Sequence, residues 1–495
     1  MKKAFKVLFL YPNGTLMNPP PISIGIFTAV LKREGFELAL FDTTLYPEQG
    51  QASDEAKQQN LQVKAFDYGS RGVAVRTTSM ADDLKKKVIA FAPDLIAISM
   101  LECTYKRSLE LLSVVEGFEV PVLAGGVFPT FAPETVLKHG AVDMVCLGEG
   151  EGPLLELCQR MSRGEDVTDI KNIYFKKDGK VIRNPLRAPV DLNALPVADY
   201  SLFEPERFFR PMAGKVYKTI PVETSRGCPF ACSFCNSPSM SKMYRDHGDV
   251  YFRKKSIDAV IREISSLVEQ WGAEYVYFAS DNFLVGSDEE LDRFVDFYKD
   301  IRLPFWIQSR PETVTRERIQ KLKAVGCHRM SMGLEHGNAE FRKNVLKKKF
   351  DNDTMIRASK IINDAGIPLT VNNMIGFPGE TRELVFDTIE LNRNIVADSM
   401  NCSVFAPFHG APLHKECVDR GYIDEDLILG SINTEAPLNM PQFPKEMIQG
   451  LRRTFVLYVK MPKEYWPRIK KAERSDAEGD REFDELRALY LEKFA

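Results

Sequence analysis

Three cysteines stand close together in the sequence GCPFACSFC: Cys228, Cys232 and Cys235, at spacings of four and three residues. Thiolates are the usual protein ligands of iron–sulfur clusters and are common ligands of zinc. Four thiolates would complete the protein ligands of a four-iron cubane, whereas three leave one iron open to another ligand. A zinc knuckle is the alternative interpretation, and it needs a fourth Cys or His, for which His247 is the nearest candidate.

Polar or small residues also end the apolar runs that follow the cysteines. They are Ser280 and Asp281 in YFASDNF, Gln308 and Arg310 in WIQSR, Glu335 in SMGLEHGN and Gly376 in NNMIGFPGET. Each of them alone has an ordinary explanation, such as a helix cap, a surface residue or a turn. Because they come in order at the ends of successive runs, we expect them to share one site with the cysteines.

The runs themselves predict a barrel. Six strand candidates alternate with amphipathic helices, of which 256–271 is the clearest, with an apolar stripe at helical spacing. The strand candidates are 221–225, 275–280, 305–309, 329–334, 369–374 and 401–405. Six such units favour a partial (β/α)6 TIM-type barrel, whose chemistry is expected at the carboxyl ends of its strands.

The first part of the chain has a second alternating series. The expected strands are 7–11, 37–41, 94–100, 121–124 and 143–147, and the expected helices are 22–33, 107–115 and 133–139. Apolar strands separated by helices predict a doubly wound, Rossmann-like parallel sheet with its ligand at the strand ends. The polar insert 49–83 is not assigned, and no G-x-G-x-x-G or P-loop is present.

The two series give the domain organisation. We expect an α/β chain with a Rossmann-like domain at 1–165 and a hairpin and Pro-rich linker at 166–210, followed by the barrel at 211–406 and a helical cap or tail at 407–495. The hairpin should turn at Asp178-Gly179.

Composition bounds the function classes. A formal net charge of -3 gives no global attraction to nucleic acid, and the densest basic run, Lys347–Lys349, is expected to be a solvated helix end. No transmembrane segment is expected, and the apolar run before Pro12 is too short for a signal peptide. Nine cysteines, an odd number, indicate a reducing, cytoplasmic location with clustered thiols as ligands.

The motif Cys-x3-Cys-x-Phe-Cys, preceded by Ser225-Arg226-Gly227, resembles the signature of the radical S-adenosylmethionine (SAM) superfamily. The resemblance implies a [4Fe-4S] cluster whose open iron binds SAM and whose electron cleaves it to a 5′-deoxyadenosyl radical. It also implies that Phe234 and Gly376 contact adenine, and that Ser280 and Asp281 receive the methionyl ammonium. Gln308 and Arg310 would hold the carboxylate, and Glu335 a ribose hydroxyl or the amino acid moiety.

The first domain resembles the cobalamin-binding domain of cobalamin-dependent radical SAM enzymes, through segments such as AGGVFPTFAPE and DMVCLGEGEGP. The resemblance implies that the corrin lies across the strand ends. The matching residues are Asn13, Gly14, Thr43, Ser99, Glu102, Gly125, Gly126, Val127, Thr130, Gly148 and Glu149. The first loop lacks the Asp-x-His-x-x-Gly pattern, so the cobalt is expected to have no protein histidine ligand.

The family implies several functions. The leading hypothesis is methylation of an unactivated carbon of a small molecule or lipid-like substrate, with flavodoxin or ferredoxin as electron donor and no nucleic acid. Radical cyclisation or rearrangement without methyl transfer is the alternative. A transfer-RNA methylthiotransferase would need three more cluster cysteines, and a sensor would not need the radical machinery. His409 and His414 are left open between loop structure and a proton role.

Overall fold

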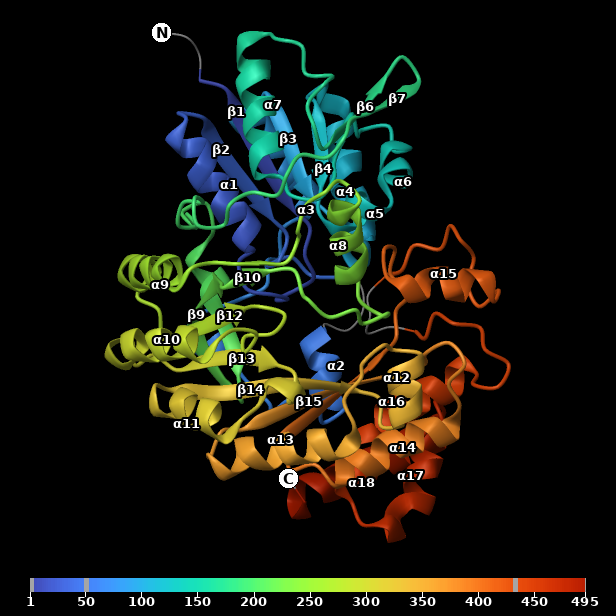
Figure 1. The fold of residues 1–495 in the computed structure, drawn as a ribbon. Coiled ribbons are helices and arrows are strands. Elements are labelled where there is room, and N and C mark those ends of the chain that lie inside the picture. Colours follow the sequence, from blue (N-terminus) through green and yellow to red (C-terminus); the bar gives the residue numbers. More distant parts are fainter. Residues whose placement is uncertain (1–3, 49–52, 431–434, 495) are drawn as a thin grey trace.

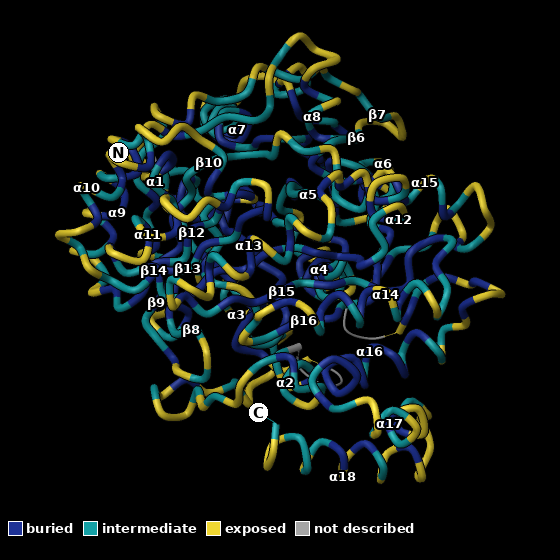
Figure 2. Tube along the Cα trace, turned by 60° about the horizontal axis from the view of Figure 1, so that its bottom comes forward, coloured by how far each residue is buried: buried dark blue, intermediate teal, exposed yellow. Residues whose placement is uncertain are grey.

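The computed structural model describes residues 4–48, 53–430 and 435–494. Two α/β units lie end to end, and the C-terminal helices pack on the second of them (Figure 1). Strands and facing helix surfaces are buried in both units, whereas the exposed residues gather on outer helices and loops (Figure 2). The fold class predicted from the sequence is therefore confirmed.

The first unit is built on a seven-stranded sheet of order β2-β1-β3-β4-β5-β6-β7. Its first five strands are parallel. They are β1 (Lys6–Tyr11), β2 (Glu37–Asp42), β3 (Leu95–Ser99), β4 (Val122–Gly125) and β5 (Met144–Cys146). The helices between and after them are α1 (Ile22–Arg33), α3 (Met80–Phe91), α4 (Tyr105–Val115), α5 (Val127–Phe131), α6 (Pro133–Leu137) and α7 (Glu151–Arg163).

Alternate residues of β1 explain why this sheet is apolar on both faces. Val7 and Phe9 belong to one core with Ile24 of α1, whereas Leu8 and Leu10 belong to another with Leu84 of α3. A strand that buries both faces reads as an unbroken apolar run, which is the pattern of VLFLY.

The predicted hairpin is present as β6 (Ile173–Lys177) and β7 (Lys180–Arg183), joined at Asp178-Gly179. It extends the first sheet, because β6 pairs antiparallel with β5. The following connector is packed rather than loose: Tyr200 is fully buried against Gly25 of α1 and joins the core that continues into the barrel.

The second unit is a curled, open sheet of order β16-β15-β14-β13-β12-β9-β8. All six predicted barrel strands are present and parallel, and β8 (Phe209–Met212) adds an antiparallel edge. The six are β9 (Lys215–Glu223), β12 (Tyr275–Ala279), β13 (Phe305–Ser309), β14 (Cys327–Glu335), β15 (Leu369–Ile375) and β16 (Ser399–Val404). The two edges β8 and β16 do not pair, so the barrel is a half-barrel.

Helices surround the half-barrel and complete the C-terminal part. Those of the barrel are α9 (Ile257–Trp271), α10 (Asp288–Ile301), α11 (Arg316–Ala324), α12 (Ala339–Asn344), α13 (Asn352–Asp364) and α14 (Arg382–Arg393). The C-terminal ones are α15 (Pro412–Asp419), α16 (Lys445–Lys460), α17 (Trp466–Ala472) and α18 (Ala477–Lys493). Within the described residues no helix is both long and apolar enough to cross a membrane.

The unassigned insert of the first unit reaches into the barrel. Its α2 (Ser53–Gln59) lies beside the barrel strands in Figure 1. The Gln62 amide donates to the carbonyl of Cys402 on β16 at 3.1 Å, and Lys64 pairs with Asp398 at 3.6 Å. Residues 49–52 of this insert lie outside the described part. The insert thus ties the first unit to the far edge of the half-barrel.

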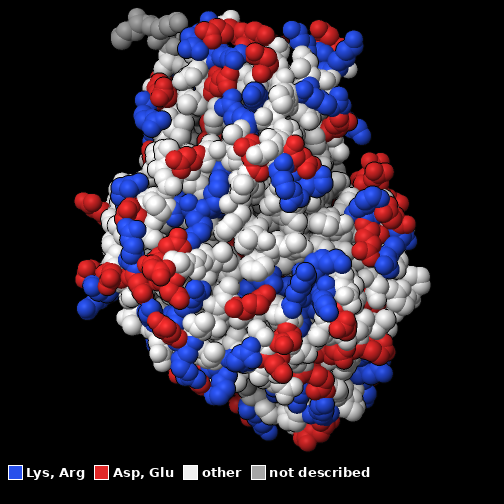
Figure 3. All heavy atoms as spheres, in the orientation of Figure 1, with Lys and Arg blue, Asp and Glu red and all other residues white. Residues whose placement is uncertain are grey.

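Charges of both signs are scattered over the face shown in Figure 3, and uncharged residues gather where the two units meet. The junction between the two units is also where the carboxyl ends of the first sheet face the cysteine loop, as described next.

Candidate active site

The three cysteines lie in the loop between β10 (Ser225–Arg226) and α8 (Ser237–Arg245), directly after β9. The backbone N–H of Ser237 donates to Cys235 Sγ at 3.4 Å, the kind of contact that cluster ligands commonly accept. Burial raises the pKa of the Cys228 and Cys235 thiols to about 11. Neutral thiols are thus favoured when no metal is bound, and iron would deprotonate them as it binds.

The zinc interpretation is not supported by the geometry. His247 is exposed, and its Nδ1 lies 3.0 Å from the carbonyl oxygen of Met243. Three thiols from one loop without a fourth ligand fit a cubane with an open iron better than a mononuclear zinc site.

Arg310 follows β13 and lies against the cysteine loop. Its Nη1 is 3.2 Å from Cys232 Sγ, and its guanidinium stacks 3.9 Å from the ring centre of Phe230. Nη2 pairs with Glu312 at 2.5 Å. The structure therefore brings Arg310 to the cysteines, as predicted. Its role toward the methionine carboxylate stays a prediction.

The end of β12 also reaches this loop. Ser280 Oγ lies 2.9 Å from Ser225 Oγ, and the Gln308 amide donates to the Ser280 carbonyl at 3.0 Å. Asp281 is within electrostatic range of Cys228 and Cys235, and desolvation by its surroundings raises the pKa of its carboxyl. Ser280, Asp281 and Gln308 thus belong to one cluster at the barrel mouth.

Glu335 ends β14 with a positive φ of 68° and is buried. Its carboxylate pairs with Lys348 Nζ at 2.9 Å, and the same ammonium donates to the Gly333 carbonyl at 2.6 Å. The expectation that Lys347–Lys349 is a solvated run is wrong for Lys348, which is buried 6.0 Å from the ring centre of Phe234. Its neighbours Lys347 and Lys349 are exposed as expected, and nothing in a run of three lysines distinguishes the buried one.

Gly376 begins the turn after β15, with φ of 87°. Its N–H and that of Phe377 both donate to Glu380 Oε2, at 2.5 and 2.9 Å. Glu380 Oε1 lies 3.1 Å from His336 Nε2, and both side chains are fully buried. Sequence reasoning missed Glu380, although a Glu within a turn of the form GFPGE is a signal for such a backbone clamp. Phe234, predicted to contact adenine, lies near this turn, with its ring centre 6.2 Å from that of Phe377.

A second site lies at the carboxyl ends of the first sheet. A cavity of about 310 Å³ opens there, between α1, the ends of β3, β4 and β5, and the start of the barrel. Five predicted cobalamin contacts line it: Ser99, Gly125, Gly126, Gly148 and Glu149. The barrel contributes Glu223, Arg226 and Tyr251 to the same wall. Among the described residues that line the cavity there is no histidine.

Small residues at this cavity have a geometric reason. A Cβ on Gly126, whose φ is 111°, would come within 2.5 Å of the Met100 carbonyl oxygen. Without a side chain, the backbone of Gly126 packs directly on that of Met100. The strand end therefore stays flat, and a flat macrocycle can lie against it. The cavity is large enough for part of a cobalamin molecule, with the remainder across the strand ends, so the residues present fit the group.

The other predicted cobalamin residues lie around the cavity without lining it. Asn13 and Thr43 hydrogen-bond each other, and Thr130 Oγ1 donates to the Gly126 carbonyl and accepts from the Gly148 N–H. Gly14 packs under Met17, and Val127 begins α5.

The Glu102 carboxylate is engaged elsewhere. It accepts the N–H groups of His409 and Leu429 at 2.8 and 3.0 Å and lies 3.0 Å from His409 Nδ1. The ring centre of His414 is 4.4 Å from that of His409. The contacts between Glu102 and His409 favour a structural role of His409 in its loop over a proton role.

Comparison with known proteins agrees with both sites. Residues 222–391 match the radical SAM superfamily and residues 17–158 match the B12 binding domain. The chain is 25% identical over 388 residues to the uncharacterized methyltransferase PH0819 of Pyrococcus horikoshii, covering 77% of this chain and 82% of that protein. It is 27% identical over 435 residues to the anaerobic magnesium-protoporphyrin IX monomethyl ester cyclase of Rubrivivax gelatinosus, covering 84% and 70%.

Among solved structures, the apo form of the cobalamin-dependent S-adenosylmethionine radical enzyme OxsB superposes with a TM-score of 0.68. The match covers 99% of this chain and 71% of that one at 14% identity, so it bears on the fold. Together these matches define an enzyme with a B12-binding domain in front of a radical SAM domain. The chain therefore combines a B12-binding domain with a radical SAM domain.

Proposed function

We propose that this protein is a methyltransferase that transfers a methyl group to an unactivated carbon of a small molecule or lipid-like substrate. The observation that carries the proposal is the shared wall of the cobalamin cavity. Glu223 and Arg226, which line it, stand five and two residues before Cys228. The two cofactor sites therefore lie against one interface, as a reaction that uses both requires.

The chemistry divides between the two sites. When bound, the cluster supplies the electron that cleaves SAM, and cobalamin carries the methyl group. Cys228, Cys232 and Cys235 would hold the cluster, with the Arg310 guanidinium 3.2 Å from Cys232 Sγ. The Gly125-Gly126 turn and the loop at Gly148 would support the corrin.

The electron for the cluster is proposed to come from a flavodoxin or ferredoxin, in the reducing cytoplasm. All nine cysteines are free, and cluster thiolates survive only where they are not oxidised to disulfides. A small-molecule substrate is proposed because two relatives are named for such substrates: the Rubrivivax magnesium-protoporphyrin IX monomethyl ester cyclase and a cytidylyl-2-hydroxyethylphosphonate methyltransferase of Streptomyces wedmorensis, 21% identical over 482 residues.

Ring closure without methyl transfer is the second candidate. It is favoured by the Rubrivivax cyclase, which matches at a slightly higher identity than PH0819. The fold and both cofactor sites serve either reaction, so only the fate of the SAM methyl group separates them.

The test uses anaerobically reconstituted protein with hydroxocobalamin, a strong reductant and SAM carrying a deuterated methyl group. A methyltransferase transfers that methyl to its cobalamin and releases S-adenosylhomocysteine before any substrate is added. Mass spectrometry of the bound cobalamin should show the labelled methyl, and a Cys235→Ala variant should retain this step while losing 5′-deoxyadenosine formation. Formation of 5′-deoxyadenosine with no S-adenosylhomocysteine above a cobalamin-free control would favour the cyclase and refute the methyltransferase.

A further inference from the structure

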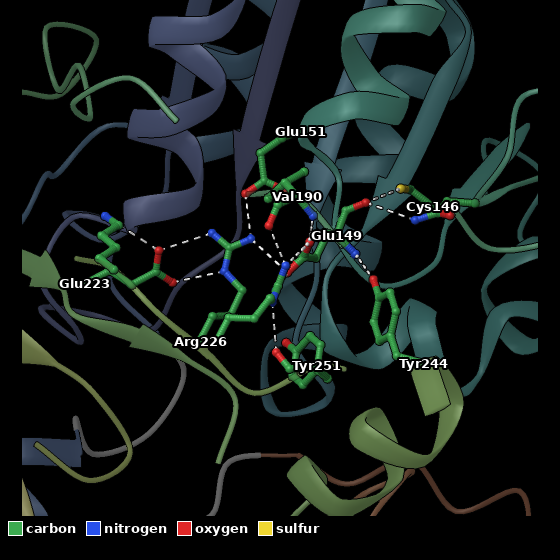
Figure 4. Close-up of polar contacts among 11 residues, drawn as sticks. Cys146, Glu149, Glu151, Val190, Glu223, Arg226, Tyr244 and Tyr251 are labelled. Carbon is green, nitrogen blue, oxygen red and sulfur yellow. Dashed lines mark hydrogen bonds and ion pairs between the residues drawn. The ribbon is translucent and has the colours of Figure 1, made fainter. Parts of the chain in front are cut away.

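Arg226 binds three carboxylates at the junction of the two units. Its Nη1 lies 3.1 Å from Glu149 Oε1 and 2.8 Å from Glu151 Oε1, and its Nε lies 3.0 Å from Glu223 Oε1 (Figure 4). Glu149 and Glu151 belong to the loop that ends the first sheet and begins α7, whereas Glu223 ends the first barrel strand. One guanidinium thus connects the wall of the cobalamin cavity to the strand that leads into the cysteine loop.

Arg253 supports the same contact from the neighbouring strand. Residues Arg226 and Arg253 are paired across the ribbon of β10 and β11 (Arg253–Lys254), and both guanidinium groups contact Glu149. Arg253 Nη1 also donates to the Val190 carbonyl at 2.6 Å. Like charges opposite each other on paired strands repel, so the shared carboxylate is what makes this pairing favourable.

The first-unit loop is also held from the other side of the cysteines. Tyr244, on α8 directly after the cysteine loop, accepts the N–H of Glu149 through its hydroxyl at 3.0 Å. A Cβ on Gly148 would lie 2.3 Å from that hydroxyl oxygen, so the close contact requires glycine. The loop 148–151 is therefore held by Arg226, two residues before Cys228, and by α8, which follows Cys235.

We propose that Arg226 is a positioning residue: its carboxylate contacts fix the distance and orientation between the cluster site and the cobalamin cavity. Its three carboxylate partners are rigidly placed, because Glu149, Glu151 and Glu223 have side chains only 6%, 6% and 12% exposed. The inference depends on the two cofactors and not on which product the enzyme makes.

The chemistry of the side chain explains why arginine is needed. A guanidinium presents five N–H donors in a rigid fork and can hold three carboxylates at once, whereas a lysine ammonium acts as a compact charge on a flexible stem. Lysine would keep the positive charge that the buried carboxylates require, but it would lose the fixed geometry. Arg226→Lys therefore separates positioning from charge neutralisation.

The experiment compares wild type, Arg226→Lys and the matched control Arg382→Lys, all reconstituted with cluster and cobalamin. Arg382 holds Glu473 through two bonds of 2.6 and 2.7 Å within the barrel and C-terminal helices, and it contacts neither site. Pulsed EPR measures the dipolar coupling between the reduced cluster and cob(II)alamin, and titration with hydroxocobalamin gives its dissociation constant.

In Arg226→Lys we expect normal iron content, a broadened distribution of cluster–cobalt distances and a dissociation constant about tenfold higher, the equivalent of one lost charged contact. Arg382→Lys should keep the wild-type distribution of cluster–cobalt distances and the wild-type cobalamin dissociation constant, even where its thermal midpoint falls. An Arg226→Lys protein with wild-type distance distribution and cobalamin affinity would overturn the proposal.

A second variant covers the case in which Arg226→Lys does not fold. Glu151→Gln removes one of the three carboxylate contacts from the first-unit side and leaves Arg226 with Glu149 and Glu223. It should broaden the distance distribution less than Arg226→Lys but in the same way. An unchanged distribution in Glu151→Gln would count equally against the proposal.

Discussion

Glu102→Ala is the perturbation that separates a structural role of this carboxylate from the cofactor role predicted for it. Its side chain is only 4% exposed and holds the segment that follows the last barrel strand. Two backbone N–H groups, of His409 and Leu429, point at its two oxygens. The same segment reaches the cysteine loop, where the Leu413 N–H donates to the Ser233 carbonyl at 2.9 Å.

The magnitude follows from these contacts. A hydrogen bond to a charged group contributes about 1.5–3 kcal/mol, and alanine would leave two buried N–H groups without an acceptor. Because water can reach part of the opened segment, each of the two lost hydrogen bonds is counted at the lower end of this range. Glu102→Ala should therefore destabilise the segment by about 3 kcal/mol. That loss raises the equilibrium constant for local opening roughly a hundredfold. Glu102→Gln keeps the shape and one carbonyl acceptor, so about 1 kcal/mol is expected.

Hydrogen exchange of peptides within 406–429, read by mass spectrometry, is the assay. Exchange there should accelerate in Glu102→Ala, less in Glu102→Gln, and not at all in Glu134→Ala, a control that removes an exposed ion pair with Arg183 from the same unit. Unchanged exchange in Glu102→Ala together with weaker cobalamin binding would refute the reasoning and restore the cofactor role.

Three further perturbations test the buried groups. Lys348→Met should lower stability by about 3–5 kcal/mol because it strands the buried Glu335 carboxylate, and Lys348→Met with Glu335→Gln should recover most of this in chemical denaturation. Gly148→Ala should lower the thermal midpoint and the cobalamin affinity, because its Cβ would clash with the Tyr244 hydroxyl. Adding Tyr244→Phe removes that hydroxyl and should restore part of both values. Burial and the nearby His409 lower the pKa of His414, so stability should fall as the pH drops below about 6.5, where the unfolded histidine takes up its proton first. His414→Gln should flatten that slope in denaturation curves measured across the window, and an unchanged slope would assign the acid sensitivity to other groups.

Strands such as β1 were predictable because they bury both faces and read as continuous apolar runs, whereas β13 and β16 bury alternate residues. Helix α3 was not predictable, since only Leu84 and Val88 of its twelve residues are buried and five of the others in MADDLKKKVIAF are charged. A stripe of two residues is too narrow to distinguish a helix from a surface loop by periodicity. The insert before it could not be placed for a related reason: its anchor, Gln62, is polar and satisfied by a carbonyl 340 residues away.

The site divides in the same way. The cysteines and the residues at the ends of the barrel strands could be predicted. Their order along the chain is part of a motif, and the sequence shows that order directly. Residues that act through contacts with distant segments were harder to predict: Lys348 sits in a lysine run, and the contacts of Glu102 are with residues more than 300 positions away. No local pattern encodes an ion pair between distant segments, because the same residue types serve equally well on a solvated surface.

The contacts between the units point to a consequence for how the enzyme works. Glu149, Gly148 and Glu102 were all expected to touch the cofactor, yet each of them also contacts the barrel or the segment that follows it. A cobalamin wall built partly from barrel-facing residues cannot move as an independent domain without breaking buried ion pairs, which is costly. Separation of the two units would break these buried contacts, so we expect the two sites to keep one arrangement.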